Sequence, residues 1–242
     1  MTSINLPTPG VALAIGAHPD DIEFGCGGTL AKWAAAGCLI HHLVCTDGSK
    51  GSWDPGEDPA RLVALRQEEQ RQASRTLGGH GDVTFLGWPD GELESGVRQR
   101  WEVAFAIRRL RPEVVLGHDP WKRWRLHPDH RHAGFLVTDG VVAARDPHFF
   151  PEQGEAPHRP AALLLFESEE PDHYEEIGDH LATKVEALLA HRSQWRSTMD
   201  IDDPDDPGQR QAFQHRVMER AREAGRAADL GAAEAFRRLT AG

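Results

Sequence analysis

The sequence has no long hydrophobic run and no sign of an export signal. Its longest uncharged apolar run, residues 161–166, is far shorter than the roughly 20 residues that span a bilayer. The first residues, 1–7, lack the basic and apolar segments of a signal peptide. These absences argue against a membrane-spanning or exported protein, and the sequence predicts a cytoplasmic one.

Cysteine is also scarce, with three residues at Cys26, Cys38 and Cys45. An odd number of cysteines without an export signal argues against a disulfide framework. Their spacing is too wide for a zinc knuckle. We therefore expect all three to be buried as small hydrophobic residues.

Positive charge is in deficit, because the net charge is -11. Nucleic acids and anionic membranes are bound chiefly by clustered Lys and Arg, so neither is an expected partner. A neutral or cationic small molecule is the expected ligand. The sequence is also compatible with a homo-oligomer.

Short apolar runs alternate with segments of helical periodicity. The run at residues 11–15 is continuously apolar, as is typical of a strand buried on both faces. Because the connections are too long for hairpins, the alternation predicts an α/β fold that is Rossmann-like, with a mostly parallel sheet and helices on both faces. The predicted strands are 11–15, 39–45, 83–86, 114–117 and 163–166, and the predicted helices are 29–36, 60–77, 97–110 and 133–144.

One domain is predicted over residues 1–242, because neither an internal repeat nor an interdomain linker is evident. Its core covers about residues 11–195. The remainder, residues 196–242, is expected to be a helical C-terminal extension around an acidic, solvated loop at 200–207.

Polar motifs follow the first and the fourth predicted strand. The first is His18-Pro19-Asp20-Asp21, and the second is His118-Asp119-Pro120, followed by His127-Pro128-Asp129-His130. With 14 histidines in the chain, a His pair at any chosen spacing is expected about once by chance. Position is more informative than spacing. In a sheet of order 3-2-1-4-5 the strand order reverses between strands one and four, and ligands bind at that point.

The residue types in these motifs suit a catalytic metal centre. A catalytic zinc site uses three protein ligands and keeps one position open, a demand that His18, Asp21 and His130 meet. Asp20 then remains free as the general base for a water whose pKa zinc lowers to about 7. His127 is placed to donate to the oxyanion of an attacked carbonyl. The same ligands accept Fe²⁺, so the metal is Zn²⁺ or, alternatively, Fe²⁺.

Six short motifs occur in a fixed order along residues 11–195. They are Ala17-His18-Pro19-Asp20-Asp21, Thr46-Asp47-Gly48, Arg66-Gln67-Glu68-Glu69, Pro89-Asp90-Gly91, His127-Pro128-Asp129-His130 and His191-Arg192-Ser193-Gln194. In order and spacing the set resembles the LmbE-like (PIG-L) deacetylase family. Members of that family are zinc-dependent hydrolases on a Rossmann-like sheet that remove acetyl groups from N-acetylglucosamine-type amino sugars.

The resemblance implies the same metal ligands and catalytic residues, and it adds Arg66 and Asp90 as contacts to the sugar or its aglycone. Asp129 is predicted either to contact the substrate or to orient a neighbouring imidazole. Four segments match no family motif, and we expect them to decide substrate choice. These segments are residues 49–59, 120–126, 146–160 and 196–242.

Four tryptophans are predicted to lie in loops on the same rim. Aromatic faces suit sugar rings, although most tryptophans simply bury apolar area. We expect one or two of them to contact the substrate. They are Trp53, Trp88, Trp121 and Trp124.

The sequence therefore predicts a zinc-dependent hydrolase that converts an N-acetylated amino sugar or glycoconjugate into free amine and acetate. One alternative is an amidase that cleaves a larger thiol-sugar conjugate. Another is a metal-binding module without turnover, against which the free carboxylate of Asp20 argues.

The stretch Gly25-Cys26-Gly27-Gly28 suggests a dinucleotide-binding loop, but that fingerprint belongs directly after the first strand. Asp20 and Asp21 occupy that place and would repel a pyrophosphate.

Overall fold

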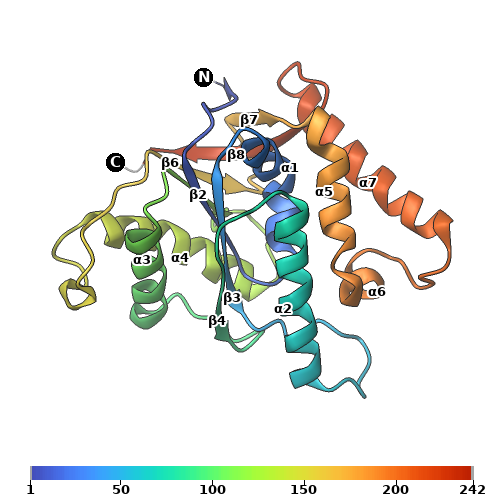
Figure 1. Cartoon of the computed structure of the whole chain (residues 1–242), viewed down its shortest axis with the longest axis horizontal. Coiled ribbons are helices and arrows are strands. Elements are labelled where there is room, and N and C mark those ends of the chain that lie inside the picture. Colours follow the sequence, from blue (N-terminus) through green and yellow to red (C-terminus); the bar gives the residue numbers. More distant parts are fainter. Residues whose placement is uncertain (1, 241–242) are drawn as a thin grey trace.

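A central sheet of eight strands organises residues 2–240, which the computed structural model describes. The strand order is β1-β7-β8-β6-β5-β2-β3-β4 (Figure 1). Every ladder is parallel except those that β8 makes with β6 and β7. The strands are β1 Ser3–Ile4, β2 Val11–Gly16, β3 Leu39–Thr46, β4 Val83–Trp88, β5 Val114–His118, β6 Ala162–Phe166, β7 His173–Glu176 and β8 Ala233–Leu239.

Five of these strands reproduce the predicted doubly wound arrangement. Along the sheet they run β4-β3-β2-β5-β6, which is the expected order 3-2-1-4-5. Strand β2 lies between β3 and β5, and all its residues after Val11 are buried. The strand order therefore reverses beside β2, and the carboxyl ends of β2 and β5 meet at one edge of the sheet.

Helices cover both faces of the sheet (Figure 1). Helices α3 (Val97–Leu110) and α4 (Pro128–Arg145) pack on one face around one apolar cluster. Helices α1 (Asp21–Ala35), α2 (Pro59–Thr76) and α5 (Leu181–Leu189) pack on the other face around a second cluster. Helix α7 (Pro207–Arg226) lies outside α5 and shares a third cluster with it. Shorter helical turns are η1 Pro151–Gln153, η2 Gly178–His180, η3 Arg192–Gln194 and α6 Trp195–Thr198.

The structure differs from the prediction in the C-terminal extension. Helix α7 is helical as expected, but the chain then enters the sheet as β8, between β6 and β7. Strand β7 was not predicted either. Residues 241–242 of the extension lie outside the described residues.

Helix α1 begins at Asp21, well before the predicted start at residue 29. Its glycines serve close packing, because a Cβ atom at Gly25 would lie 2.5 Å from the Phe166 ring and one at Gly28 would lie 2.6 Å from Ile177. The helix is interrupted at Cys26, where φ is -148°. The glycine-rich stretch therefore lies inside a kinked helix, not in a loop after a strand.

No helix within residues 2–240 combines the length and the apolar character needed to cross a membrane. The three cysteines are free and buried, as expected.

Candidate active site

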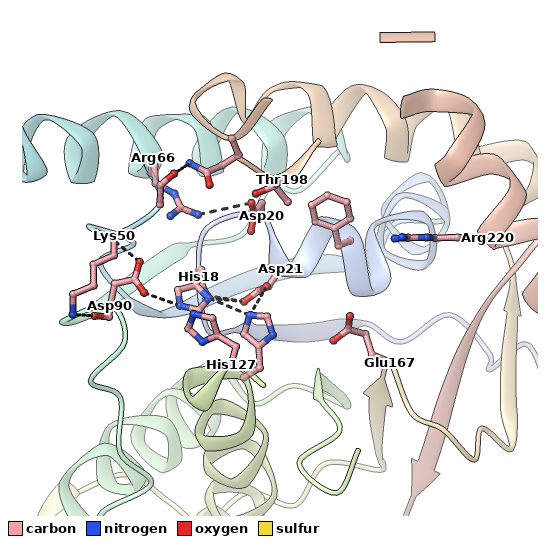
Figure 2. A pocket seen from close by; sticks show the side chains of 14 residues that line it. His18, Asp20, Asp21, Lys50, Arg66, Asp90, His127, Glu167, Thr198 and Arg220 are labelled. Carbon is pink, nitrogen blue, oxygen red and sulfur yellow. Dashed lines mark hydrogen bonds and ion pairs between the residues drawn. The ribbon is translucent and has the colours of Figure 1, made fainter. Parts of the chain in front are cut away.

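A cavity of about 550 Å³ lies where the first residues of α1 and α4 meet. Figure 2 shows Lys50 and Asp90 at one end and Glu167 and Arg220 at the other. The lining includes seven of the eight predicted site residues, all except Asp129. The full lining is His18, Asp20, Asp21, Phe24, Lys50, Gly51, Arg66, Asp90, His127, His130, Glu167, Gln194, Thr198 and Arg220.

The three predicted metal ligands converge in this cavity. The distance from His18 Nδ1 is 3.2 Å to His130 Nε2 and 3.4 Å to Asp21 Oδ2, and His130 Nε2 is 3.3 Å from Asp21 Oδ1. A tetrahedral ion with bonds of about 2.0–2.1 Å separates its ligand atoms by about 3.3–3.4 Å. The two contacts of Asp21 are made by its two different oxygens. Overlapping groups of these side chains could hold an ion, namely His18 with His127 and His130, and Asp21 with His118 and His130.

His18 is oriented by two carboxylates on the side away from the other ligands. Its Nε2–H lies 3.1 Å from Asp129 Oδ2 and 3.1 Å from Asp90 Oδ1. Nδ1 is thereby directed toward the other predicted ligand atoms, and a metal ion bound at Nδ1 would displace its proton. Burial lowers the pKa of His18, but hydrogen bonds to Asp129, Asp21 and Asp90 outweigh it and raise the pKa well above 6.5. Surroundings that favour a proton on this ring also favour a metal cation beside it.

His118 also contacts the predicted ligand Asp21, although the sequence motif predicted no role for it. Its Nε2 lies 3.2 Å from Asp21 Oδ2, and its ring stacks on that of His130 with centroids 4.5 Å apart. Arg125 donates to His118 Nδ1 at 2.9 Å, which leaves Nε2 to carry the proton that faces Asp21. Burial would raise the pKa of Asp21, but the neighbouring His130 and His118 hold it well below its usual value.

Glu167 was also missed, although it follows β6 just as His118 closes β5. It lines the cavity and forms an ion pair of 2.8 Å with Arg125. His118 is the last residue of β5 and Glu167 follows the last residue of β6, so both lie at the edge of the sheet where the site lies. That position is the signal that would have identified them.

Asp20 lines the cavity beside the ligands and belongs to none of the donor sets that can hold a metal. It is the residue before α1, and its side chain makes no capping bond to the helix. Its carboxylate lies 3.8 Å from Arg66 Nη2. Burial raises the pKa of Asp20 to about 6, although Arg66 acts in the opposite direction. A carboxylate with a pKa near neutrality can both accept and return a proton.

His127 is the N-cap of α4 and is partly exposed to the cavity. Its Nδ1 accepts the backbone N–H of Asp129 at 3.3 Å, so Nε2 carries the proton of the neutral ring. Burial lowers the pKa of His127, and the neighbouring His18 and His130 lower it further. The side chain is thus a neutral hydrogen-bond donor at pH 7.

The two predicted substrate contacts Arg66 and Asp90 do line the cavity. Asp129 does not, because it is completely buried and accepts N–H groups from Gly91 at 2.6 Å and Leu93 at 3.2 Å. Its contact with His18 fits the orienting role and not the predicted contact with a substrate.

Only two of the four unmatched segments, and none of the four tryptophans, contribute to the cavity lining. None of the four singled-out tryptophans is among the residues that line the cavity. Segments 49–59 and 196–242 contribute Lys50, Gly51, Thr198 and Arg220 to the lining, whereas 120–126 and 146–160 contribute no residue to it.

The fold and this cavity define a Rossmann-like α/β protein with a two-histidine, one-carboxylate cluster suited to a divalent metal. The chain belongs to the PIG-L family, since the family model described as GlcNAc-PI de-N-acetylase matches residues 13–141. The diacetylchitobiose deacetylase of Thermococcus kodakarensis is 37% identical over 186 residues, which cover 76% of this chain and 69% of that protein.

Two further relatives agree with this assignment. The structure of N,N'-diacetylchitobiose deacetylase from Pyrococcus horikoshii, complexed with its inhibitor MPG, superposes with a TM-score of 0.86 at 27% identity and covers 96% of this chain and 85% of that one. The 1D-myo-inositol 2-acetamido-2-deoxy-alpha-D-glucopyranoside deacetylase of Streptomyces avermitilis is 30% identical over 166 residues. That match covers 59% of this chain and little more than half, 56%, of the relative.

Proposed function

We propose that this protein is a zinc-dependent hydrolase that removes the N-acetyl group from an N-acetylglucosamine-type amino sugar or glycoconjugate. The observation that carries the proposal is the cluster of His18, Asp21 and His130, with donor atoms 3.2–3.4 Å apart, beside the uncommitted carboxylate of Asp20. A structural metal site is closed by four ligands and has no use for such a base. The names of the relatives support the substrate class.

His18, Asp21 and His130 are the proposed metal ligands, and Fe²⁺ would be held by the same donors. When bound, a divalent ion supplies Lewis acidity, which lowers the pKa of a water molecule and polarises the acetyl carbonyl. Asp129 accepts a hydrogen bond from the Nε2–H of His18, so that Nδ1 is available as a ligand.

Asp20 makes the proton transfers of the proposed reaction, and His127 stabilises the oxyanion. Asp20 accepts a proton from the water that attacks the acetyl carbon. The Nε2–H of His127 donates to the oxyanion that forms on the carbonyl oxygen. Asp20 then returns its proton to the nitrogen as the C–N bond breaks, which releases acetate and the free amine.

Arg66 and Asp90 are the proposed contacts to the sugar. Arg66 is already fixed by bonds from its Nη1 to the Gly48 carbonyl and from its Nη2 to the Pro19 carbonyl. Asp90 is fixed by the backbone N–H of Lys50 at 3.0 Å. Burial would raise the pKa of Asp90, but its hydrogen bond with His18 and the charge of that ring bring it to about 2. It therefore remains an acceptor for sugar hydroxyls at any physiological pH.

A substrate screen tests the proposal. Acetate release is measured for N-acetylglucosamine, its chitin oligomers and its inositol glycosides, with and without a chelator. We expect release that is lost with the chelator and restored by Zn²⁺ or Fe²⁺. Elemental analysis of protein purified without added metal identifies the ion. Release of a larger acid from a thiol conjugate, with no acetate release, would instead establish the amidase alternative.

The Asp20→Asn variant tests the general base. We expect it to keep its bound metal and to lose about 10²–10⁴-fold in kcat, the usual contribution of acid-base catalysis. The control is Asp82→Asn, because the side chain of Asp82 is 77% exposed and lies outside the cavity lining. Full turnover in Asp20→Asn would remove this residue from the mechanism.

A further inference from the structure

Asp20 has a backbone conformation that L-residues rarely adopt. Its φ is +100° and its ψ is -28°, outside the regions favoured for any residue but glycine. Such strain costs of order 1–3 kcal/mol and persists only where the surroundings enforce it. The conformation matters because it directs a carboxylate that does not cap its own helix into the cavity.

Two side chains of α2 hold one peptide group in this conformation. The carbonyl oxygen of Pro19 accepts from Arg66 Nη2 at 2.7 Å, and the N–H of Asp20 donates to Gln70 Oε1 at 3.0 Å. Both partners contact the same peptide bond, one at each end. Rotation of that peptide plane about the N–Cα bond is what φ of Asp20 measures, so Arg66 and Gln70 together fix it.

Gln70 is itself oriented by a buried chain of polar groups. Its Nε2 donates to Glu23 Oε1 at 2.7 Å, and Glu23 Oε2 lies 3.2 Å from His191 Nε2. A carboxylate only accepts, so Glu23 requires the amide nitrogen on its side and thereby directs the amide oxygen toward the Asp20 N–H. Glu23, Gln70 and His191 are completely buried, and none of them lines the cavity.

We propose that Gln70, oriented by Glu23 and His191, is a positioning residue that holds Asp20 in its strained conformation and so places the general base. This inference rests on the proposed function for the role of Asp20. It also explains why three polar side chains are kept inside the protein, out of contact with the cavity.

The activity test uses Gln70→Leu. We expect kcat to fall about 100-fold, the effect of a displacement of about 1 Å in a catalytic group. KM and metal content should change less than about 3-fold. The matched control is Gln67→Leu, on the same helix but outside the chain of hydrogen bonds, which should leave kcat unchanged. Unchanged kcat in folded, metal-loaded Gln70→Leu would overturn the proposal.

An exchange of side chains provides a rescue that a merely structural role would not give. Gln70→Glu alone places two carboxylates side by side, and we expect reduced kcat. In the double variant Glu23→Gln/Gln70→Glu, a carboxylate oxygen at position 70 can again accept from Asp20, while the amide at position 23 donates to it and accepts from His191. We expect kcat to return to within about 3-fold of wild type. Failure of the exchange to restore kcat would contradict the proposal, even if Gln70→Leu does not fold.

A stability test is independent of catalysis. At positive φ glycine is favoured over alanine, so Asp20→Gly should melt above Asp20→Ala. Without Gln70 the backbone at position 20 can relax, so the difference in melting temperature between the two variants should be smaller in the Gln70→Leu background. An equal difference in both backgrounds would show that Gln70 does not enforce the strain. Because melting temperatures do not depend on catalysis, this test of Gln70 is independent of whether the wild-type protein deacetylates amino sugars.

Discussion

Asp129 acts through His18 and not on the cavity, because its carboxylate is buried and hydrogen-bonded to the His18 ring. The Asp129→Asn variant removes the charge that holds the Nε2–H of His18 and makes Nδ1 a more basic ligand. We expect about 10–100-fold weaker metal binding, as is usual for partners of ligating histidines. Competition with a chromophoric chelator measures the affinity. The control is Asp139→Asn, on the exposed side of the same helix, which should bind metal like wild type.

Glu175 couples the stability of the β1–β7 edge to pH. Its buried carboxylate contacts Lys32, His173 Nε2 at 2.7 Å and the Leu6 N–H at 2.7 Å. Burial alone would raise the pKa of Glu175, but these hydrogen bonds lower it below its usual value. A folded-state pKa below the unfolded one stabilises the protein above the unfolded pKa of about 4.3, and this stabilisation is lost as pH falls through the folded pKa.

Glu175→Gln should therefore be less stable than wild type at pH 7, and the difference should shrink below about pH 4. Urea unfolding of both proteins between pH 7 and pH 3 measures it. The comparison with wild type isolates Glu175 from the other acidic residues. A difference in unfolding free energy that does not change with pH would show that the Glu175 pKa is not lowered.

The sequence brought the proposed metal ligands to one place because His18 and Asp21 follow β2, and His130 lies at the start of α4, after the loop that follows β5. His118 lies at the end of β5, and its contact with Asp21 could have been expected from that position. Gln70 was not predictable. Nothing in the sequence of α2 distinguishes it from Gln67 or Gln72, and only the packing of α2 against the start of α1 brings its amide to Asp20.

Helix α1 carries Asp21 at its start and is held in the middle by the C-terminal strand. The carboxylate of Glu234 accepts the N–H groups of Gly28 at 2.9 Å and Thr29 at 2.7 Å, which the kink at Cys26 leaves free. It also pairs with Lys184 at 2.6 Å. An anion does bind at the glycine-rich stretch, but it is a side chain of this protein and not the pyrophosphate of a dinucleotide.

Glu234→Ala should lower the unfolding free energy by about 3–5 kcal/mol, because it leaves the buried Lys184 ammonium without its partner. Urea or thermal unfolding measures the loss. The control Glu223→Ala, at an exposed position of α7, should remain within about 0.5 kcal/mol of wild type. An equal effect of both variants would assign no special role to Glu234.

The elements that were predicted well are those with strong local patterns, such as the continuous apolar runs and the helix Val97–Leu110. Strands β7 and β8 were missed because their sequences carry Glu, Arg and Ala, which do not favour strands. They are strands because they pair with each other and with β6, a long-range effect that overrides local propensity. Helix α1 was predicted too short because glycines usually end helices, whereas here they permit contact with Phe166 and Ile177.

Segments from distant parts of the chain build the cavity. Lys50 lies near one end of it, and Arg220 from α7 lies at the other (Figure 2). Within residues 2–240, Arg220 makes no hydrogen bond or ion pair. The Arg220→Gln variant should therefore lose about 10-fold in kcat/KM for an amino-sugar glycoside with an anionic aglycone, the effect of one charged hydrogen bond.

The same variant should change kcat/KM for the matched neutral glycoside less than for the anionic one. Arg222→Gln is the control, since Arg222 only pairs with Glu219 on the surface of the same helix. Equal losses on both glycosides would show that Arg220 does not distinguish them by charge.

The doubly wound centre of the sheet followed from the alternation of strands and helices, and the proposed site lies beside the reversal of strand order. The other half of the sheet did not follow from that alternation, because β1, β7 and β8 are joined by pairings between residues far apart in sequence.

Within residues 2–240, β8 is the only link between β7 and the rest of the sheet, and β1 in turn attaches only to β7. During synthesis on the ribosome, β1 and β7 therefore have no place to dock until residues 233–239 have left the exit tunnel. The pair formed by β1 and β7 must therefore wait for β8, so a slow closure step is expected in folding. A premature stop before residue 233 would leave β6 and the β1–β7 pair with exposed strand edges that can aggregate.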